Sequence, residues 1–253
     1  MSGIEHFQSD GVDIAWLDEG DGEPILLIHG FGSSIAVNWA STGWIETLAR
    51  DGRRVVAFDN RGHGRSGKPH DPALYHPATM ARDAANLLAH LGIARADVMG
   101  YSMGARIGAF LALDRPEMVR SLVLGGLGMA LVEGMGGQEE IVAALEAPSL
   151  DAVAGETGRI YRKFAEQTGS DLKALAACMR GARATIPAER LAAVGAPILV
   201  AVGTKDKVAG SGERLAELIP GAGFLEIPGK EHLPATGDKA FKAGVLAFLQ
   251  KRP

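Results

Sequence analysis

The sequence predicts an α/β fold, with a mostly parallel central sheet, helices on both faces of that sheet and a small helical insertion. Short, continuous apolar runs alternate with segments whose apolar residues recur at helical spacing, which is typical of a parallel sheet covered by helices. One long segment late in the chain contains no convincing strand. Small or chemically reactive residues directly follow several apolar runs, where an open parallel sheet binds its ligands.

Composition fits one large globular domain that carries an insertion. Of 253 residues, 47% are apolar and 22% are charged, as in an ordinary globular protein. The net charge of −4 and the lack of a Lys/Arg-rich run give no reason to expect a nucleic-acid partner. No apolar run approaches the roughly 20 residues of a membrane span, and the first ten residues lack the regions of a signal peptide. Cys178 is the single cysteine, which suits a reducing cytoplasm.

The expected strands and helices alternate along most of the chain. Residues 12–17 alternate like an early strand, and we expect the segment before them, which contains His6, to be irregular. The remaining expected strands are buried runs at residues 25–28, 54–58, 97–100, 121–124, 197–203 and 224–227. Helical spacing predicts helices at residues 44–50, 79–91, 103–113, 212–218 and 239–249.

The segment without strands predicts an inserted cap. We assign residues 127–190 to this cap and residues 1–126 and 191–253 to the core, because the strand pattern resumes after the segment. Its entry is rich in Gly and Met, and three helices are expected at residues 138–147, 150–167 and 171–183. We expect their apolar stripe to seat on the sheet edge or to line a pocket; its members include Ile141, Leu145, Ile160, Phe164, Leu172 and Leu175.

Residues 98–105 indicate the end of a buried strand, a tight turn with Ser102 at its tip, and the first turn of a helix. Such a turn lifts the serine side chain clear of the sheet and points helix N–H groups at the reacting centre. Gly100 and Gly104 supply the room that the turn needs on either side. A serine hydroxyl also needs a base and a group that stabilises the oxyanion.

His232 is the candidate for that base. It lies in a loop directly after the last expected strand, so it can reach the sheet edge that holds Ser102. We expect His29 and His63, each followed by glycine, to hold loop geometry through hydrogen bonds of their rings. The other histidines are expected to be solvated or surface residues: His6, His70, His76 and His90.

Asp206 is the candidate carboxylate that would hold the histidine tautomer and stabilise the imidazolium. It follows the strand at residues 197–203, and the chain order serine, acid, histidine matches a known catalytic arrangement. Glu231 and Asp238 are rival acids. Asp59 also lies at the sheet edge, where its sequence context favours a pairing with Arg61 or a loop hydrogen bond.

Two backbone N–H groups are expected to form the oxyanion hole. Met103 follows the serine and offers one donor from the helix N-terminus, and the loop after Ile28 offers the other. We assign this second donor to Phe31, with Gly32 as the alternative. No cluster of residues has the spacing of metal ligands, so we expect neither a metal nor a cofactor.

Five motifs in one order give the chain a resemblance to the α/β-hydrolase fold family over nearly its whole length. They are His-Gly-Phe-Gly at residues 29–32, Asp-Asn-Arg-Gly-His-Gly-Arg-Ser at 59–66, Gly-Tyr-Ser-Met-Gly at 100–104, Gly-Thr-Lys-Asp at 203–206 and Gly-Lys-Glu-His at 229–232. The resemblance implies a triad of Ser102, Asp206 and His232, an oxyanion hole made by the amides of Phe31 and Met103, and a helical cap.

The serine at the turn limits the classes of reaction that the resemblance implies. Dehalogenases and epoxide hydrolases of this fold use aspartate at the turn, so Ser102 argues against both. We expect a serine hydrolase that cleaves a small carboxylic ester or lactone through an acyl-enzyme. Two alternatives stay open. One is a hydrolase-like small-molecule receptor with a mobile cap. The other is carbon–carbon bond hydrolysis, in which a cap arginine would bind a substrate carboxylate; the candidates are Arg159, Arg162, Arg180 and Arg183.

Overall fold

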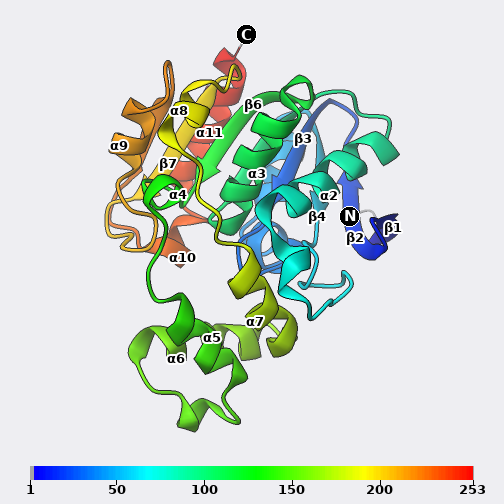
Figure 1. Ribbon diagram of the computed structural model, residues 1–253. Coiled ribbons are helices and arrows are strands. Elements are labelled where there is room, and N and C mark those ends of the chain that lie inside the picture. Colours follow the sequence, from blue (N-terminus) through cyan, green and yellow to red (C-terminus); the bar gives the residue numbers. More distant parts are fainter. Residues whose placement is uncertain (1–2, 253) are drawn as a thin grey trace.

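The computed structural model describes residues 3–252 and contains an eight-stranded, mostly parallel sheet (Figure 1). The strands lie in the order β1-β2-β4-β3-β5-β6-β7-β8, and all neighbours from β4 to β8 run parallel. Their bounds are Glu5–Ser9 (β1), Val12–Glu19 (β2), Glu23–Ile28 (β3), Arg53–Phe58 (β4), Ala96–Tyr101 (β5), Val119–Gly125 (β6), Ile198–Gly203 (β7) and Gly223–Ile227 (β8). The predicted α/β fold class is confirmed.

One strand was not predicted. β1 pairs antiparallel with β2, and in it Phe7 and Ser9 alone are buried, so its sequence lacks the apolar run that marks the other strands. His6 therefore lies in a strand and hydrogen-bonds Asp13 at 2.7 Å, and the expectation of an irregular segment is wrong. The turn between the two strands contains Asp10 at φ 47° and Gly11 at φ 78°, the Asp-Gly pair that favours a tight hairpin.

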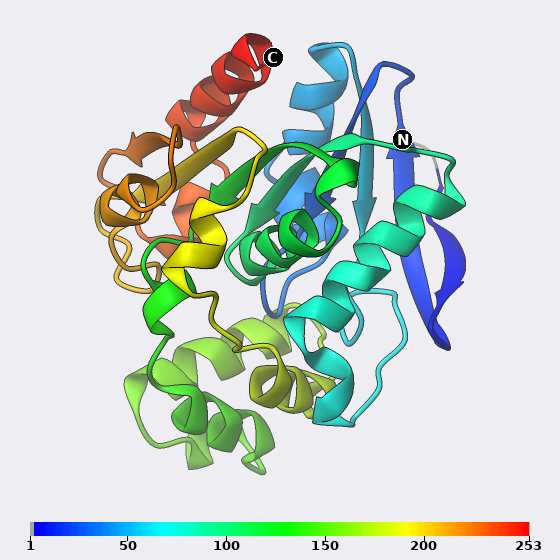
Figure 2. The same ribbon diagram turned by 45° about the horizontal axis from the view of Figure 1, so that its top comes forward.

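Helices cover both faces of the sheet (Figure 2). α1 (Trp44–Arg50), α11 (Lys239–Lys251) and the π-helical segment η1 (Ile35–Ala40) bury their apolar residues on one face. The opposite face packs against the remaining core helices, which are α2 (Pro77–His90), α3 (Met103–Asp114), α8 (Ala188–Ala192) and α9 (Gly212–Glu217). No helix within residues 3–252 is long and apolar enough to cross a membrane.

Helices alone fill the chain between β6 and β7, and three of them form a group beside the end of the sheet (Figure 1). These three are α5 (Gln138–Glu146), α6 (Glu156–Gln167) and α7 (Leu172–Gly181). They bury a small apolar cluster of their own, in which Ile141, Leu145 and Leu175 are at most 2% exposed. The cap expected at residues 127–190 stays a prediction, since α4 (Ala130–Glu133) and α8 also place Leu131 and Leu191 in the main core.

Two details of the expected cap helices are wrong. The helix expected at residues 150–167 is divided into a short 3₁₀ turn, η4 (Leu150–Ala152), and α6, and Gly155 between them has a φ of +83°. A left-handed glycine cannot continue a right-handed helix, which explains the break. Ile160 faces solvent with 53% of its surface exposed and lines nothing.

Candidate active site

The turn between β5 and α3 holds Ser102 in an unusual backbone conformation. Its φ of 54° and ψ of −112° make it one of two non-glycine residues with positive φ within residues 3–252. A side chain at Gly104 would place its Cβ 1.9 Å from the carbonyl oxygen of Ile28, and one at Gly100 would meet the Gly104 carbonyl at 2.2 Å. Glycine is therefore required on both sides of the serine, and this strained turn projects Ser102 beyond the sheet.

Ser102, His232 and Asp206 form a continuous chain of hydrogen bonds. The His232 Nε2 atom lies 3.0 Å from Ser102 Oγ, and the His232 Nδ1 atom lies 2.7 Å from Asp206 Oδ2. The Asp206 side chain is fully buried, whereas the His232 side chain is 14% exposed. This arrangement leaves the Nε2 lone pair facing the serine when Nδ1 carries the proton, which is the geometry of a nucleophile, a base and an orienting acid.

The acid and the base come from neighbouring loops that are tied together. The Lys205 N–H donates to the Lys230 carbonyl at 3.0 Å, and the Gly229 N–H donates to Thr204 Oγ1 at 2.7 Å. Asp206 Oδ1 accepts the N–H groups of Val208 and Ala209 at 2.9 and 3.0 Å, which leaves Oδ2 for the histidine. The carboxylate is thereby held from both sides.

His232 is the first residue of a short helix, α10 (His232–Ala235), where a loop was expected. The Tyr101 hydroxyl, next to the serine in sequence, donates to the His232 carbonyl at 2.5 Å and fixes the backbone of the histidine. Of the rival acids, Glu231 is exposed, and Asp238 caps α11 by accepting the Ala240 N–H at 2.8 Å. Neither has a hydrogen bond to His232 in the described part of the chain.

The amides proposed for the oxyanion hole border the same cavity as Ser102. Phe31 and Met103 both line that cavity, and neither of their N–H groups donates a hydrogen bond to another residue within 3–252. The loop that carries Phe31 is fixed at Gly30, whose N–H donates to Asn38 Oδ1 at 2.9 Å. Free N–H donors beside a nucleophile suit an oxyanion. The role of both amides stays a prediction.

His29 and His63 have the structural positions that were expected. His29 Nδ1 donates to the Gly30 carbonyl at 2.8 Å and its Nε2 accepts the Asn60 N–H at 2.9 Å, so it joins two loops. His63 Nδ1 donates to the Arg61 carbonyl at 2.9 Å. Burial lowers the pKa of His29 to about 4 and that of His63 to about 3, because desolvation disfavours the charged imidazolium.

Asp59 takes the second of its two expected roles. Its carboxylate accepts the N–H of Ile35 at 2.6 Å and that of Arg65 at 2.8 Å, so it forms loop hydrogen bonds. Arg61 pairs instead with Asp83 at 2.7 Å, and both side chains are 1% exposed. Burial raises the pKa of the Asp59 carboxyl. Asp59 therefore joins two loops at the sheet edge near the serine, and it is not one of the residues in the hydrogen-bonded chain of Ser102, His232 and Asp206.

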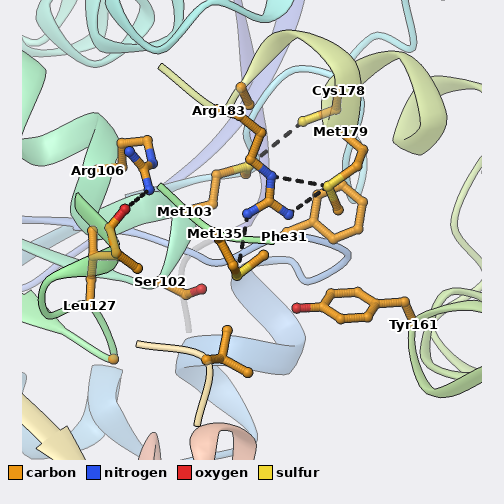
Figure 3. A pocket seen from close by; sticks show the side chains of 14 residues that line it. Phe31, Ser102, Met103, Arg106, Leu127, Met135, Tyr161, Cys178, Met179 and Arg183 are labelled. Atoms are coloured by element: carbon orange, nitrogen blue, oxygen red, sulfur yellow. Dashed lines mark hydrogen bonds between the residues drawn. The ribbon is translucent and has the colours of Figure 1, made fainter. Parts of the chain in front are cut away.

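A cavity of about 470 Å³, counting its mouth toward solvent, opens at Ser102 and extends below the cap helices. Figure 3 shows residues of the core, among them Phe31, Ser102 and Met103, and residues of the cap, among them Tyr161, Met179 and Arg183, around this space. Its mixture of apolar and polar side chains is typical of a small-molecule site. Cys178 also borders the cavity, where burial raises its thiol pKa to about 12 and makes it a poor nucleophile.

Three polar residues of this cavity were missed or left unresolved by the sequence. Arg106 lies inside a predicted helix and Tyr161 inside a predicted cap helix, and their spacing gives no signal that separates them from surface residues. Arg183 was one of four candidate arginines and is the one that lines the cavity. The other three bind elsewhere: Arg159 to the Leu150 carbonyl, Arg162 to Glu166 and Arg180 to Glu146.

Comparisons with known proteins agree with this architecture. Residues 23–138 match the family model of the α/β hydrolase fold. A hydrolase from Pseudomonas aeruginosa PA01 has a similar crystal structure, with a TM-score of 0.83, 27% identity and coverage of 97% of this chain and 98% of the other. A non-heme haloperoxidase from Rhodococcus erythropolis is 27% identical over 96% of this chain and 97% of its own length.

Sequence similarity to other curated proteins is confined to part of each chain. A 2-hydroxymuconate semialdehyde hydrolase from Pseudomonas sp. (strain CF600) is 36% identical over 47% of this chain and 42% of its own length. The chain spans only 32–42% of the length of this protein and of two further curated relatives. Full-length structural similarity, the matching family model and the strand order together show that the chain has the α/β-hydrolase fold.

Proposed function

We propose that the protein is a serine hydrolase that cleaves a small carboxylic ester or lactone through an acyl-enzyme. The observation that carries the proposal is the hydrogen-bonded chain from Asp206 through His232 to Ser102, which opens on the cavity between core and cap. Relatives that are named as hydrolases support the general class of reaction. The single cysteine, buried and unpaired, suits an enzyme of the cytoplasm.

Acylation begins with proton transfer from Ser102 Oγ to His232 Nε2, across the observed 3.0 Å. The serine oxygen attacks the carbonyl carbon of the substrate, and the carbonyl oxygen becomes an oxyanion that accepts the N–H groups of Phe31 and Met103. Asp206 stabilises the imidazolium that forms, since its carboxylate already accepts the His232 Nδ1 proton. His232 then protonates the leaving alcohol as the tetrahedral intermediate collapses.

Deacylation repeats these steps with water. His232 Nε2 accepts a proton from the water, whose oxygen attacks the acyl carbon, and the same two amides hold the second oxyanion. Collapse of this intermediate returns the proton to Ser102 Oγ and releases the carboxylic acid. One site therefore serves both halves of the reaction, and no residue outside the triad has to carry a proton.

A panel of small esters, lactones and thioesters, assayed with the wild-type protein and with Ser102→Ala, tests the proposal. We expect turnover of at least one ester or lactone and a loss of kcat of at least about a thousandfold in Ser102→Ala. Ser170→Ala, a change in the loop between α6 and α7, is the matched control. Hydrolysis that persists unchanged in Ser102→Ala would show that the serine is not the nucleophile.

Carbon–carbon bond hydrolysis by the same triad is the second candidate. The observation that favours it is the guanidinium of Arg183 in the cavity, together with the local similarity to a 2-hydroxymuconate semialdehyde hydrolase. A 1,3-diketone or vinylogous diketone included in the panel distinguishes the two reactions, because an esterase leaves it intact. Tight ligand binding without multiple turnover would instead support the receptor.

A further inference from the structure

Within residues 3–252, the guanidinium of Arg183 has hydrogen bonds to sulfur atoms alone. Its Nε and one terminal nitrogen donate to Met179 Sδ at 3.1 and 2.5 Å, and the other terminal nitrogen donates to Met135 Sδ at 3.5 Å (Figure 3). Thioether sulfur is a weak acceptor. In the described part of the chain no carboxylate pairs with Arg183, although the side chain is partly buried and a cation withdrawn from water normally has a partner of opposite charge.

A second cation lies nearby and is bound by backbone carbonyl groups. Arg106 also lines the cavity, and its guanidinium donates to the carbonyls of Ala130 at 2.8 Å and Ala184 at 2.6 Å. Burial and then the charge of Arg183 lower the pKa of Arg106 to about 10, and burial also lowers the pKa of Arg183. Arginine stays protonated near neutral pH in proteins, so both guanidinium groups carry a positive charge. The cavity lining thus carries two positive charges and, within residues 3–252, no Asp or Glu.

Tyr161 adds a neutral donor on the same side. Its ring packs near Phe31, with 6.0 Å between ring centroids, and its hydroxyl has no hydrogen-bond partner within residues 3–252. Figure 3 shows this hydroxyl pointing into the space that Ser102 and Arg183 border. The cap therefore presents one charged group whose acceptors are weak thioethers and one hydroxyl that has no hydrogen-bond partner within residues 3–252.

We propose that Arg183 and Tyr161 form a subsite for a carboxylate of the substrate, so that the enzyme prefers esters or lactones that carry a second, ionised carboxyl group. The guanidinium would donate to the carboxylate in place of the weak thioether acceptors, and the Tyr161 hydroxyl would donate a further hydrogen bond. Arg106 would contribute fixed positive charge from the core side. This inference rests on the proposed hydrolase function and names its substrate class.

Matched pairs of alkyl esters test the subsite. One series has the carboxylate on the acyl side, as in the monoethyl esters of succinate, glutarate and adipate, and the other has it on the alcohol side, as in O-acetyl hydroxy acids. Each acid is compared with its carboxamide, which has nearly the same shape without the charge. We expect the wild-type protein to favour the ionised member of at least one series by about tenfold or more in kcat/KM.

The variants are Arg183→Met, Arg183→Lys and Tyr161→Phe, with Arg180→Met as the matched control. Arg180 lies on α7, is 43% exposed and pairs with Glu146, outside the cavity. We expect Arg183→Met to bring the acid-to-amide ratio of kcat/KM close to one, Arg183→Lys to retain part of the preference, and Tyr161→Phe to reduce it several-fold. Arg180→Met should keep the wild-type ratio, and thermal unfolding checks that each variant is folded.

Binding provides a readout that does not depend on turnover. Ser102→Ala titrated with glutarate should release heat on binding, and the same protein with Arg183→Met added should not. The inference is overturned if the wild-type protein hydrolyses neutral esters through Ser102 but shows no preference for the ionised member of either series. It is equally overturned if glutarate, succinate and adipate fail to bind. A protein that binds these dianions but hydrolyses no ester would retain the subsite and refute the proposed reaction.

Discussion

Asp206 shows how single residues define the candidate site. Its two carboxylate oxygens have separate tasks, because Oδ1 accepts two backbone N–H groups and Oδ2 accepts the proton of His232 Nδ1. The side chain therefore cannot rotate without losing hydrogen bonds in a fully buried position. The histidine is held in one tautomer, and its Nε2 lone pair is directed at Ser102.

The substitution Asp206→Asn tests whether Asp206 holds His232 in this tautomer. The amide can keep the two backbone N–H donors on its oxygen, but its NH₂ group then faces His232 Nδ1 and requires the opposite tautomer. With its proton on Nε2 the histidine cannot accept from Ser102, so we expect kcat to fall by a factor on the order of a thousand or more. Asp238→Asn, at the cap of α11, should leave kcat within about twofold. Equal activity of the two variants would contradict the proposed role of Asp206.

At the scale of elements, the loops after β3 and β4 act as one unit. His29 bonds both its own loop and the Asn60 amide, and Asp59 accepts the N–H of Ile35 across the same boundary. His63 packs against the His29 ring, with 5.3 Å between centroids, and against Phe31. These contacts fix the loop whose Phe31 amide is the proposed oxyanion donor.

This loop unit predicts a dependence of stability on pH. The pKa of His29 is about 4 and that of His63 about 3 in the folded state, below the ordinary value of 6.5. The unfolded chain therefore binds more protons below pH 6.5, and the stability that the neutral rings contribute is lost as pH falls toward the folded values. We expect the free energy of unfolding to drop by about 2 kcal/mol for each histidine between about pH 7.5 and about pH 5.

Urea unfolding at the two pH values measures this drop. His90→Gln is the control, because His90 is exposed on α2, and it should keep the full dependence. His63→Gln should show a smaller drop than the wild-type protein. A free energy of unfolding that is the same at both pH values would mean that the two rings do not remain neutral in the folded protein.

For the whole molecule, one buried carboxylate joins the strands at the end of the sheet opposite the candidate site. Asp97 of β5 is fully buried and lies 3.2 Å from Arg53 of β4, 3.7 Å from Arg120 of β6 and 2.7 Å from Arg252 beyond α11. It also accepts a hydrogen bond from Ser121 at 2.7 Å. Three strands and the end of the last helix thus meet at one buried carboxylate, and the exposed Glu23 pairs with the same three arginines.

The substitution Asp97→Asn should therefore lower the free energy of unfolding of the whole protein. Removing the negative charge leaves the guanidinium groups close together and only partly neutralised. The loss of one partner of a buried ion pair typically lowers the free energy of unfolding by about 3–5 kcal/mol. Glu46→Gln breaks the exposed pair with Arg50 and should cost less than about 1 kcal/mol. Thermal or urea unfolding of the two variants compares these values. A loss for Asp97→Asn as small as that for Glu46→Gln would refute the role of Asp97.

The sequence predicts those parts of the fold and of the candidate site for which the backbone topology alone determines which residues lie together. Six apolar runs and one alternating segment marked seven strands. The rule that ligands bind beyond parallel strand ends placed Ser102, Asp206 and His232 at one edge, where the structure brings them within hydrogen-bonding distance. β1 escaped prediction because two alternating buried residues are too few to distinguish a strand from an irregular segment. The split of the helix at Gly155 depends on a local φ that periodicity does not report.

The cavity could not be predicted because it depends on how the cap helices pack. All four cap arginines occupy similar helical contexts, and only side-chain packing separates Arg183, which reaches the cavity, from Arg162, which binds the carbonyls of α5. Tyr161 and Ile160 are adjacent in sequence, yet one lines the cavity and the other is exposed. The orientation of α6 decides between them, and no local pattern encodes it.

Covalent labelling by a fluorophosphonate, followed by peptide mass spectrometry, tests directly whether Ser102 is an activated nucleophile. Such reagents phosphonylate a serine only where a base and an oxyanion site activate it. We expect one adduct on the peptide that contains Ser102, with loss of ester hydrolysis in proportion to labelling, and no adduct in Ser102→Ala. An unlabelled Ser102 in a protein that still hydrolyses esters would contradict this expectation.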